Sequence, residues 1–327
     1  MASEADSPFR WTQWGAIQVG TQSFPLWTAT LGTENQACPG IGFIGGVHGL
    51  EWIGSEVVLA FMRSLSSRLK WDALLRHKLT NLHLAFFPVV NPGGLILGTR
   101  ANPNGVDLMR NAPLDAEAEV PYLIGGQRHS ARLPWYRGEK GAPMQPESGA
   151  LCDFVRAELL HRPFSLVLDC HSGFGLEDRI WFPYAWTDTP FEHLPEIHAL
   201  TEIYEDTYVN HRYRFEPQCT QYNAHGDLWD FLYLESRQTP HRTFIPLTLE
   251  MGSWLWVKKN PRQLFSRHGI FNPKHGHRLQ RVLRRHISLM EFLCRATHSA
   301  HYWLPAGSIR QEQTRKAMDR WYPEPPP

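Results

Sequence analysis

The chain has 327 residues, of which 42% are hydrophobic and 20% are charged, and its formal net charge is +1. This ordinary globular composition excludes disorder of the whole chain. A net charge so close to zero gives no general attraction to nucleic acid or to an anionic membrane, so we expect neither as a partner.

The cysteines and the apolar runs indicate the compartment. The five cysteines include no CxxC pair, which argues against a disulfide framework and against a cysteine-based zinc cluster. The N-terminal segment has no basic region followed by an apolar run, and no apolar run reaches about 18 residues, the length that spans a bilayer. We therefore expect a soluble, cytoplasmic protein, in which some of the 17 histidines could bind a metal.

Predicted strands and helices alternate along the chain. Alternating apolar and polar residues predict a strand or hairpin near the start, at 10–31. Short apolar runs predict further strands at 41–47, 82–90, 164–170, 179–184 and 244–250. Apolar residues at helical spacing predict helices at 51–69, 147–161, 194–208, 226–235 and 275–296.

This alternation predicts an α/β fold. We expect a single domain over residues 1–310, built on a mixed, mostly parallel twisted sheet with helices on both faces. Residues 311–327 are expected to form a C-terminal tail, frayed or extended at its proline-rich end. The loop-rich segment at 91–147 is long for a compact domain, and loops of that length are usually functional.

Acidic and histidine side chains follow the predicted central strands, where open α/β sheets place their ligands. His48 and Glu51 lie in the turn between the strand at 41–47 and the next helix, and imidazole together with carboxylate suits zinc. His171 directly follows the strand at 164–170. Two histidines and one glutamate leave a coordination position open for water, which is typical of a catalytic zinc site. We expect these side chains to hold one Zn²⁺ ion.

Three further residues suit hydrolysis at such a site. Glu250 ends the strand at 244–250, where it could take a proton from water and return it to a leaving amine. Arg100 and Arg110 flank a glycine turn, and arginine can stabilise an oxyanion or bind a carboxylate in a bidentate fork. Each signal is weak alone, because acids and arginines are common on protein surfaces.

Together these motifs resemble the zinc metallocarboxypeptidase family, the carboxypeptidase A-like enzymes, as a divergent member of bacterial type. The resemblance covers about residues 40–255, and the motifs stand in the order and with the separations of the family. The matching motifs are HGLE at 48–51, NPGG…GTRANPNGVDLMRN at 91–111, LDCHSG at 168–173 and TLEMG at 248–252.

The resemblance implies the same zinc ligands and the same general base and acid, and it adds roles for other residues. Arg100 would polarise the scissile carbonyl and stabilise its oxyanion. Arg110, with the neighbouring Asn111, would bind a carboxylate of the substrate. Asp107 would orient His48, as metal-bound histidines usually require.

Two positions of the family pattern are harder to assign. Tyr222 matches the family's mobile tyrosine, because a glycine and an aspartate–tryptophan segment follow it, and Tyr213 and Tyr233 are alternatives. The family usually reads D-x-N-R-N, in which the asparagine before the arginine helps to bind a terminal carboxylate. That position is Met109 here, and methionine makes no useful hydrogen bond to a carboxylate. The substrate could therefore carry its carboxylate elsewhere, or lack one.

We accordingly expect a zinc metallocarboxypeptidase, a hydrolase that cleaves a C-terminal peptide bond or a related amide bond with metal-activated water. One alternative is an N-acyl amino acid deacylase of the succinylglutamate desuccinylase or aspartoacylase type, and another is a murein-peptide amidase. The substrate is then a peptide or an acyl amino acid. A zinc-binding scaffold without catalysis is a further alternative, but it would not need Glu250.

Two remaining patterns have simpler interpretations. The GxGxxG match at 40–45 lies within a predicted strand instead of the turn after it, so it indicates close packing and not dinucleotide binding. The basic stretch at 278–286 has apolar residues at helical spacing. It therefore reads as the solvated face of an amphipathic helix and not as a nucleic-acid site.

Overall fold

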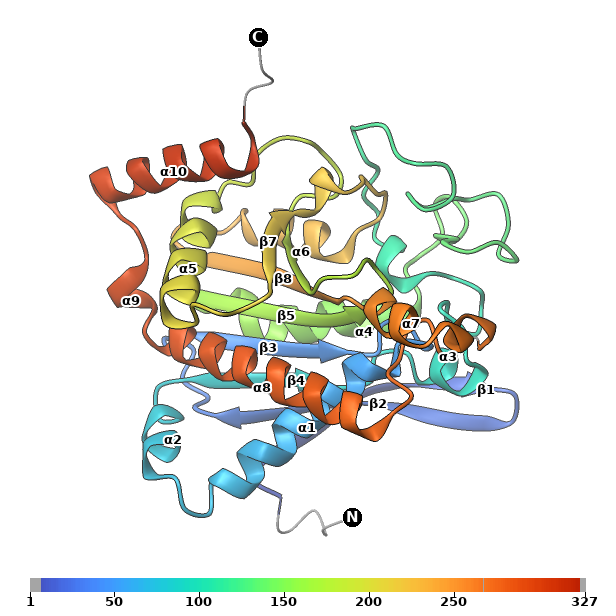
Figure 1. The fold of residues 1–327 in the computed structure, drawn as a ribbon, viewed down its shortest axis with the longest axis horizontal. Coiled ribbons are helices and arrows are strands. Elements are labelled where there is room, and N and C mark those ends of the chain that lie inside the picture. Colours follow the sequence, from blue (N-terminus) through green and yellow to red (C-terminus); the bar gives the residue numbers. More distant parts are fainter. Residues whose placement is uncertain (1–6, 267, 324–327) are drawn as a thin grey trace.

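The computed structural model describes residues 7–266 and 268–323, and it shows one eight-stranded sheet covered by helices (Figure 1). The order of the strands across the sheet is β1-β2-β4-β3-β5-β8-β6-β7. The strands are β1 (Arg10–Val19), β2 (Gln22–Gly32), β3 (Gly40–Gly45), β4 (His83–Phe87), β5 (Phe164–Ser172), β6 (Arg179–Phe182), β7 (Arg214–Pro217) and β8 (Thr243–Met251).

The central strands are parallel, and the flanking strands β2 and β6 join them through antiparallel contacts. Strands β4, β3, β5 and β8 run parallel to one another. On one side β1 and β2 form the expected hairpin, which is antiparallel to β4, and on the other side β6 is antiparallel to β8. The expected mixed, mostly parallel sheet is therefore confirmed.

Helices lie on both faces of this sheet, as expected. Helices α1 and α8 contact β3 and β5 on one face, whereas α4 and α6 lie on the other (Figure 1). The α-helices of the described residues are α1 (Trp52–Arg68), α2 (Ala73–Lys78), α3 (Pro92–Leu97), α4 (Pro146–Val155), α5 (Leu194–Thr207), α6 (Leu228–Ser236), α7 (Trp254–Lys259), α8 (Gly276–His298), α9 (Ala300–Trp303) and α10 (Gly307–Trp321). Short 3₁₀ turns and one π turn add Leu108–Arg110, Gln218–Thr220, Pro261–Phe265 and Arg156–Leu160.

The central strands are continuous apolar runs because both of their faces are covered. Every residue of β3, β4 and β5 is buried. Glycines let the helices approach closely: a Cβ at Gly54 of α1 would lie 2.1 Å from the Cys170 carbonyl oxygen of β5. A Cβ at Gly42 would lie 2.8 Å from the Leu159 side chain. The glycines of the GxGxxG match therefore serve packing inside the sheet.

The C-terminal segment differs from the expected tail. Residues 311–321 continue α10, which packs against α5. Trp321 is buried there, and its indole Nε1 donates to the Phe215 carbonyl at 2.8 Å. The sequence hid this helix because it is mostly polar and buries little besides Ala317 and Trp321. Residues 324–327 of the proposed tail lie outside the described residues, and a domain boundary at residue 310 stays a prediction.

The carboxyl ends of the central strands meet at one edge of the sheet, and this edge gathers the predicted site residues. His171 lies in β5 and pairs in register with Glu250 of β8, so their backbones are neighbours. His48 follows β3 after a turn at Gly46, where a φ of +66° favours glycine. The sheet topology alone therefore brings residues that are more than 200 positions apart to one place.

Candidate active site

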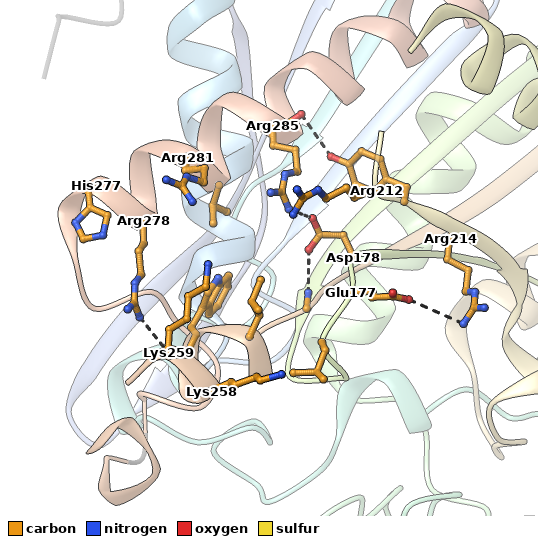
Figure 2. A pocket seen from close by; sticks show the side chains of 16 residues that line it. Glu177, Asp178, Arg212, Arg214, Lys258, Lys259, His277, Arg278, Arg281 and Arg285 are labelled. Carbon is orange, nitrogen blue, oxygen red and sulfur yellow. Dashed lines mark hydrogen bonds and ion pairs between the residues drawn. The ribbon is translucent and has the colours of Figure 1, made fainter. Parts of the chain in front are cut away.

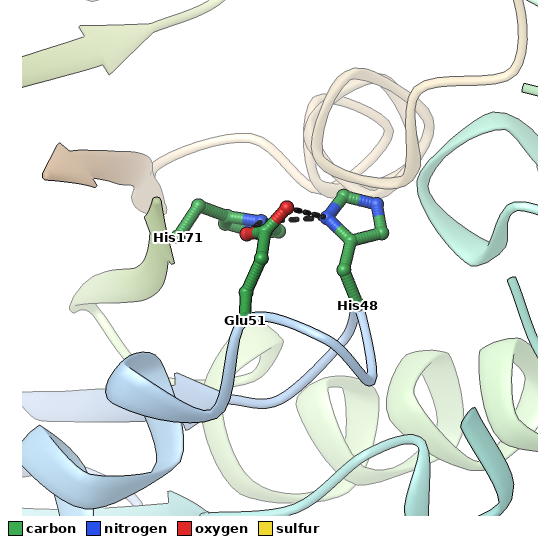
Figure 3. Close-up of side chains that lie close together, drawn as sticks. All are labelled: His48, Glu51 and His171. Atoms are coloured by element: carbon green, nitrogen blue, oxygen red, sulfur yellow. Dashed lines mark hydrogen bonds and ion pairs between the residues drawn. The ribbon is translucent and has the colours of Figure 1, made fainter. Parts of the chain in front are cut away.

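His48, Glu51 and His171 converge on one point (Figure 3). One potential ligand atom from each side chain lies within 4.8 Å of the others, and all three residues are buried. The two histidine Nδ1 atoms are 3.1 Å apart. The Glu51 carboxylate lies beside both, with Oε1 at 3.1 Å from His48 Nδ1 and Oε2 at 3.3 Å from His171 Nδ1.

The outward nitrogens of both histidines are held by buried aspartates. His48 Nε2 lies 3.1 Å from Asp107 Oδ1, which is the contact expected for Asp107. His171 Nε2 lies 2.7 Å from Asp169 Oδ2, and the Trp229 indole also donates to that oxygen at 2.9 Å. Nε2 donates in both contacts, so each Nδ1 is left as a lone-pair donor toward the shared point.

Asp169 was missed by the sequence analysis, although a signal was available. It stands two residues before His171 in the same strand, and residues i and i+2 of a strand lie on one face. An aspartate at this spacing from a metal-binding histidine is therefore a candidate for orienting it.

The turn that carries His48 and Glu51 is fixed by its backbone. Asn91 accepts a hydrogen bond from Gly94 N at 2.7 Å, which caps α3, and its amide donates to the Val47 carbonyl at 3.2 Å. Asn91 N also donates to the Gly46 carbonyl at 2.9 Å. The Glu51 carboxylate is oriented by Ser172 N, which donates to Oε2 at 3.0 Å. These bonds tie together the segments after β3, β4 and β5.

The electrostatics of these three side chains suit a cation. Burial by itself would raise the pKa of Glu51, but His48, His171 and Arg100 hold that pKa well below its usual range. Burial would lower the pKa of His171, but Asp169 and Glu51 raise it well above the ordinary histidine value. Two imidazole nitrogens and a carboxylate are zinc ligands, and their close approach around one point fits a bound Zn²⁺ ion.

Glu250 lies next to these three side chains, and one oxygen of its carboxyl group lacks a polar partner within the described part of the chain. Its Oε2 atom is buried and has no hydrogen-bond partner among the described residues. Burial raises the pKa of Glu250 to about 8, and the negative charges of Glu51 and Asp169 act in the same direction. A carboxyl group with such a pKa can both accept and release a proton near neutral pH.

Arg100 is bound to the metal-site carboxylates. Its Nε donates to Asp107 Oδ2 at 2.8 Å and its terminal nitrogen donates to Glu51 Oε1 at 3.0 Å. Burial opposes the charge, but Asp107 and Glu51 raise the pKa of Arg100 above its usual value. The side chain is 25% exposed, so a fixed positive charge stands beside the metal ligands within reach of solvent.

Arg110 and Tyr222 lie together. Arg110 is 3% exposed, and its terminal nitrogen donates to the Tyr222 hydroxyl at 3.3 Å. Its remaining contacts are with carbonyl oxygens, of Ile124 at 3.4 Å and of Met109 at 3.5 Å. Burial raises the pKa of Tyr222, and the charge of Glu250 adds to that shift, so the hydroxyl stays protonated.

The two alternative tyrosines lie elsewhere. The Tyr213 hydroxyl contacts His286 Nδ1 of α8 at 2.8 Å, and the Tyr233 hydroxyl contacts His193 Nδ1 at 2.9 Å. Both are buried in the core, with no contact to the predicted site.

The side chains of Met109 and Asn111 both contact other parts of the protein. Met109 is buried in the hydrophobic core. The Asn111 amide donates to the Arg137 carbonyl at 3.1 Å, and its oxygen accepts from Gln145 N at 2.6 Å. Both polar ends of Asn111 thus anchor the loop at 113–147. Each of these bonds uses one of the two donor or acceptor sites at its end of the amide, so the expectation that Asn111 binds substrate stays a prediction.

The family model for zinc carboxypeptidases, Peptidase_M14, matches residues 17–254. The chain belongs to the zinc carboxypeptidase family. The resemblance noted in the motifs is therefore confirmed, and the match includes every residue assigned to the site.

Curated relatives of this chain match over parts of their length. Carboxypeptidase SOL1 of Arabidopsis thaliana is 35% identical over 30% of this chain and 21% of its own length. The carboxypeptidase N catalytic chain of Rattus norvegicus is 25% identical over 71% of this chain and 54% of its own. Murein peptide amidase A of Escherichia coli K12 is 33% identical over 36% of this chain and 43% of its own. The chain thus spans about half, or less, of these relatives.

Solved structures agree on the fold. Thrombin activatable fibrinolysis inhibitor superposes with a TM-score of 0.66 at 18% identity, covering 89% of this chain and 70% of that one. Carboxypeptidase A from Helicoverpa armigera superposes with a TM-score of 0.58 at 15% identity, covering 88% of this chain and 70% of that one.

Among the described residues, no helix is long and apolar enough to cross a membrane.

Proposed function

We propose that the protein is a zinc-dependent hydrolase that cleaves the C-terminal peptide bond of a peptide, or a closely related amide bond. The observation that carries the proposal is the convergence of His48, Glu51 and His171, with the half-buried Glu250 on the neighbouring strand, whose Oε2 atom has no hydrogen-bond partner among the described residues. Three ligands from the protein leave one position for water or substrate, so we propose a single ion.

A bound zinc ion would supply Lewis acidity, which makes water more acidic and polarises a carbonyl group. Glu250 accepts the proton of the attacking water at its carboxylate, and it returns a proton to the departing amine. Burial raises the pKa of this carboxyl group and a bound cation would lower it, so both the acid and the base form are accessible for the two transfers. Arg100 stabilises the negative charge that develops on the carbonyl oxygen, because its guanidinium group stands beside the ligand Glu51.

Arg110 is the proposed anchor for a substrate carboxylate. The residue is buried, and within the described residues its side-chain hydrogen-bond partner is the Tyr222 hydroxyl. A carboxylate could therefore bind bidentately without breaking an ion pair within the described residues. Tyr222 stands beside the same guanidinium group and would contact the substrate next to the scissile bond.

An amide without a free terminal carboxylate is the second candidate substrate. The observation that favours it is Met109, since the residue before Arg110 is apolar and buried in the core. The murein peptide amidase similarity belongs with this candidate. The acyl amino acid alternative is separate, because an N-acyl amino acid keeps a free carboxylate on the residue that is released. A scaffold without catalysis is disfavoured, because it leaves the carboxyl group of Glu250 without a use.

We also propose a cytoplasmic location and a single catalytic domain. Support for the location is that all five cysteines are free thiols, three of them buried.

The test is a comparison of substrates with the zinc-loaded protein. Matched peptides with free and amidated C-termini, together with several N-acyl amino acids, are incubated and their products are read by mass spectrometry. A chelator and Glu250→Gln serve as controls. Chelator-sensitive loss of one residue from free C-termini supports a carboxypeptidase. Cleavage of amidated peptides at least as fast as free ones supports the second candidate, and cleavage of only the acyl amino acids supports the deacylase alternative. No turnover of any substrate contradicts all three.

A further inference from the structure

A second cavity lies outside the active site, between α7, the first half of α8 and the segments that precede β6 and β7 (Figure 2). Its volume is about 820 Å³, which is the size of a pocket for a small organic ligand. None of the proposed zinc ligands lines it, and neither do Glu250, Arg100, Arg110 or Tyr222. The cavity is therefore separate from the residues of the proposed reaction.

The lining of this cavity is strongly basic. Figure 2 shows cationic side chains arranged around it from three separate segments. Seven lysines and arginines face only two carboxylates, a local excess of five positive charges in a chain whose net charge is +1. The cations are Arg212, Arg214, Lys258, Lys259, Arg278, Arg281 and Arg285.

The two carboxylates are already engaged, and most of the cations are not. Asp178 pairs with Arg285 and also accepts from Gly252 N at 3.0 Å. Glu177 lies 4.0 Å from Arg214. By contrast, Arg212, Lys258, Lys259 and Arg281 have no hydrogen bond or ion pair from their side chains within the described residues, and all four are exposed. These groups are free to bind an anion.

The basic residues of α8 oppose the stability of the helix that carries them. Arg278, Arg281 and Arg285 are spaced three and four residues apart on one side of the helix, so their like charges repel. The first turn holds no acidic residue, although the positive end of the helix dipole favours one. A bound anion would relieve both costs. An amphipathic helix explains why the basic residues of 278–286 face solvent. It does not explain why three of the arginines gather at one cavity.

We propose that this basic cavity binds a ligand that carries two or more phosphate groups. Several separated cations match several phosphates better than one small anion, because arginine and lysine each bind phosphate through charge-assisted hydrogen bonds. Apolar side chains complete the lining, including Trp256 and Val282, which suits a ligand with an organic part.

Two sources of clustered phosphate fit this chemistry, a free polyphosphorylated molecule and the headgroup of a phosphorylated lipid. The headgroup is included because Lys258 also lines an adjoining apolar hollow formed in part by Trp254 and Leu264. Those two side chains are 54% and 57% exposed. The experiment therefore has one arm for each source.

In the first arm, the full-length zinc-loaded protein is titrated calorimetrically with inorganic tripolyphosphate at two salt concentrations. In the second arm it is sedimented with phosphatidylcholine vesicles that contain or lack a bisphosphorylated phosphatidylinositol. The test variant is Lys259→Glu with Arg281→Glu. The control is Arg63→Glu with Lys70→Glu, which changes the net charge equally on an exposed surface near the end of α1. Any binding of phosphate to the zinc ion should be the same in the wild type and in both double variants. The difference in affinity between the variants therefore measures binding at the cavity.

We expect binding in at least one arm, weakened by salt and weakened about tenfold or more in the test variant, with little change in the control. Binding of tripolyphosphate assigns a free ligand, and binding only to phosphoinositide vesicles assigns a headgroup. No binding in either arm overturns the proposal, and so does equal weakening in both double variants. If the glutamate variant does not fold, Lys259→Gln with Arg281→Gln takes its place. Peptide hydrolysis without phosphate should be unchanged in these variants, so the outcome is separate from that of the proposed function.

Discussion

The half of the active site that would bind the metal and the half that would bind the substrate differ in the hydrogen bonds that orient their side chains. In the metal half, each histidine donates a hydrogen bond from Nε2 to an aspartate, and Glu51 accepts hydrogen bonds from Arg100 and from Ser172 N. In the other half, Arg110 has one side-chain partner, the Tyr222 hydroxyl at 3.3 Å, and otherwise contacts only carbonyl oxygens.

This difference separates chemistry from recognition. The metal half departs in no residue from the family pattern, whereas the substrate half has lost an amide at Met109 and has turned Asn111 toward the loop at 113–147. A family member can change its substrate while it keeps its reaction, because within the described residues no hydrogen bond joins Arg110 to the proposed zinc ligands. The predictions below test that separation.

Glu250→Gln should have the largest effect. The variant keeps the shape of the side chain but removes the acid and base, so turnover should fall about 10²–10⁴-fold while zinc content stays near one ion per chain. Turnover is measured on the best substrate, and zinc by atomic absorption. A variant that turns over at the rate of the wild type would show that another group moves the proton.

Arg100→Ala should lower turnover about 10²–10³-fold with a smaller change in KM, because Arg100 is proposed to act on charge that develops during the reaction. Arg100→Lys keeps the charge, and should recover part of the rate. Since Arg100 also contacts Glu51 and Asp107, zinc content must be measured in both variants. Loss of zinc in place of loss of rate would make Arg100 a support of the metal site only.

Asp169→Asn should weaken zinc binding about 10–100-fold. The asparagine still fills the space, but it no longer compensates the charge that His171 gains on binding a cation. Asp107→Asn is the matched variant on His48 and should behave alike. Competition with a fluorescent chelator measures both affinities. If Asp169→Asn binds zinc with the affinity of the wild type, Asp169 contributes by orienting His171 and not by its negative charge.

The stability of the metal-free protein should depend on pH through Glu250. Its pKa in the folded protein is about 8, above its usual 4.5, so the folded state binds a proton that the unfolded state releases. Stability from this group is fully present below about pH 4.5 and is lost as the pH rises through about 8. Glu51 and Asp107 have lowered pKa values and act in the opposite direction, below about pH 4.5.

Urea unfolding in the presence of a chelator, between about pH 5 and pH 9, measures this dependence. Glu250→Gln should flatten the decline, and zinc should do the same in the wild type because a cation favours the ionised carboxylate. A decline of equal steepness in Glu250→Gln would assign it to other groups.

Local patterns were sufficient to predict most of this molecule. Apolar runs located five of the eight strands, because strands with covered faces are rich in hydrophobic residues, and alternation at 10–31 located the hairpin of β1 and β2. Only β7, with four residues, was missed. The same reasoning placed His48, Glu51, His171 and Glu250 at one edge, since parallel strands end together.

Features that depend on contacts between distant segments could not be predicted in this way. The use of Asn111 is set by Arg137 and Gln145, which lie in a loop without periodicity. The basic cavity is assembled from segments around residues 177, 213, 256 and 281, each of which reads as ordinary surface. Helix α10 was missed because polar helices carry little signal until their partner is known.

Met109→Asn should have the smallest effect and bears most directly on recognition. Restoring an amide beside Arg110 adds a hydrogen-bond donor for a carboxylate, so KM for peptides with a free C-terminus should fall about tenfold or less, with kcat little changed. Met109→Leu is the matched control, because it preserves volume without adding a donor and should leave KM unaltered. If Met109→Asn folds and the ratio of rates on free and amidated peptides does not move, the residue before Arg110 does not set carboxylate recognition. The changed half of the site would then be the loop that Asn111 anchors.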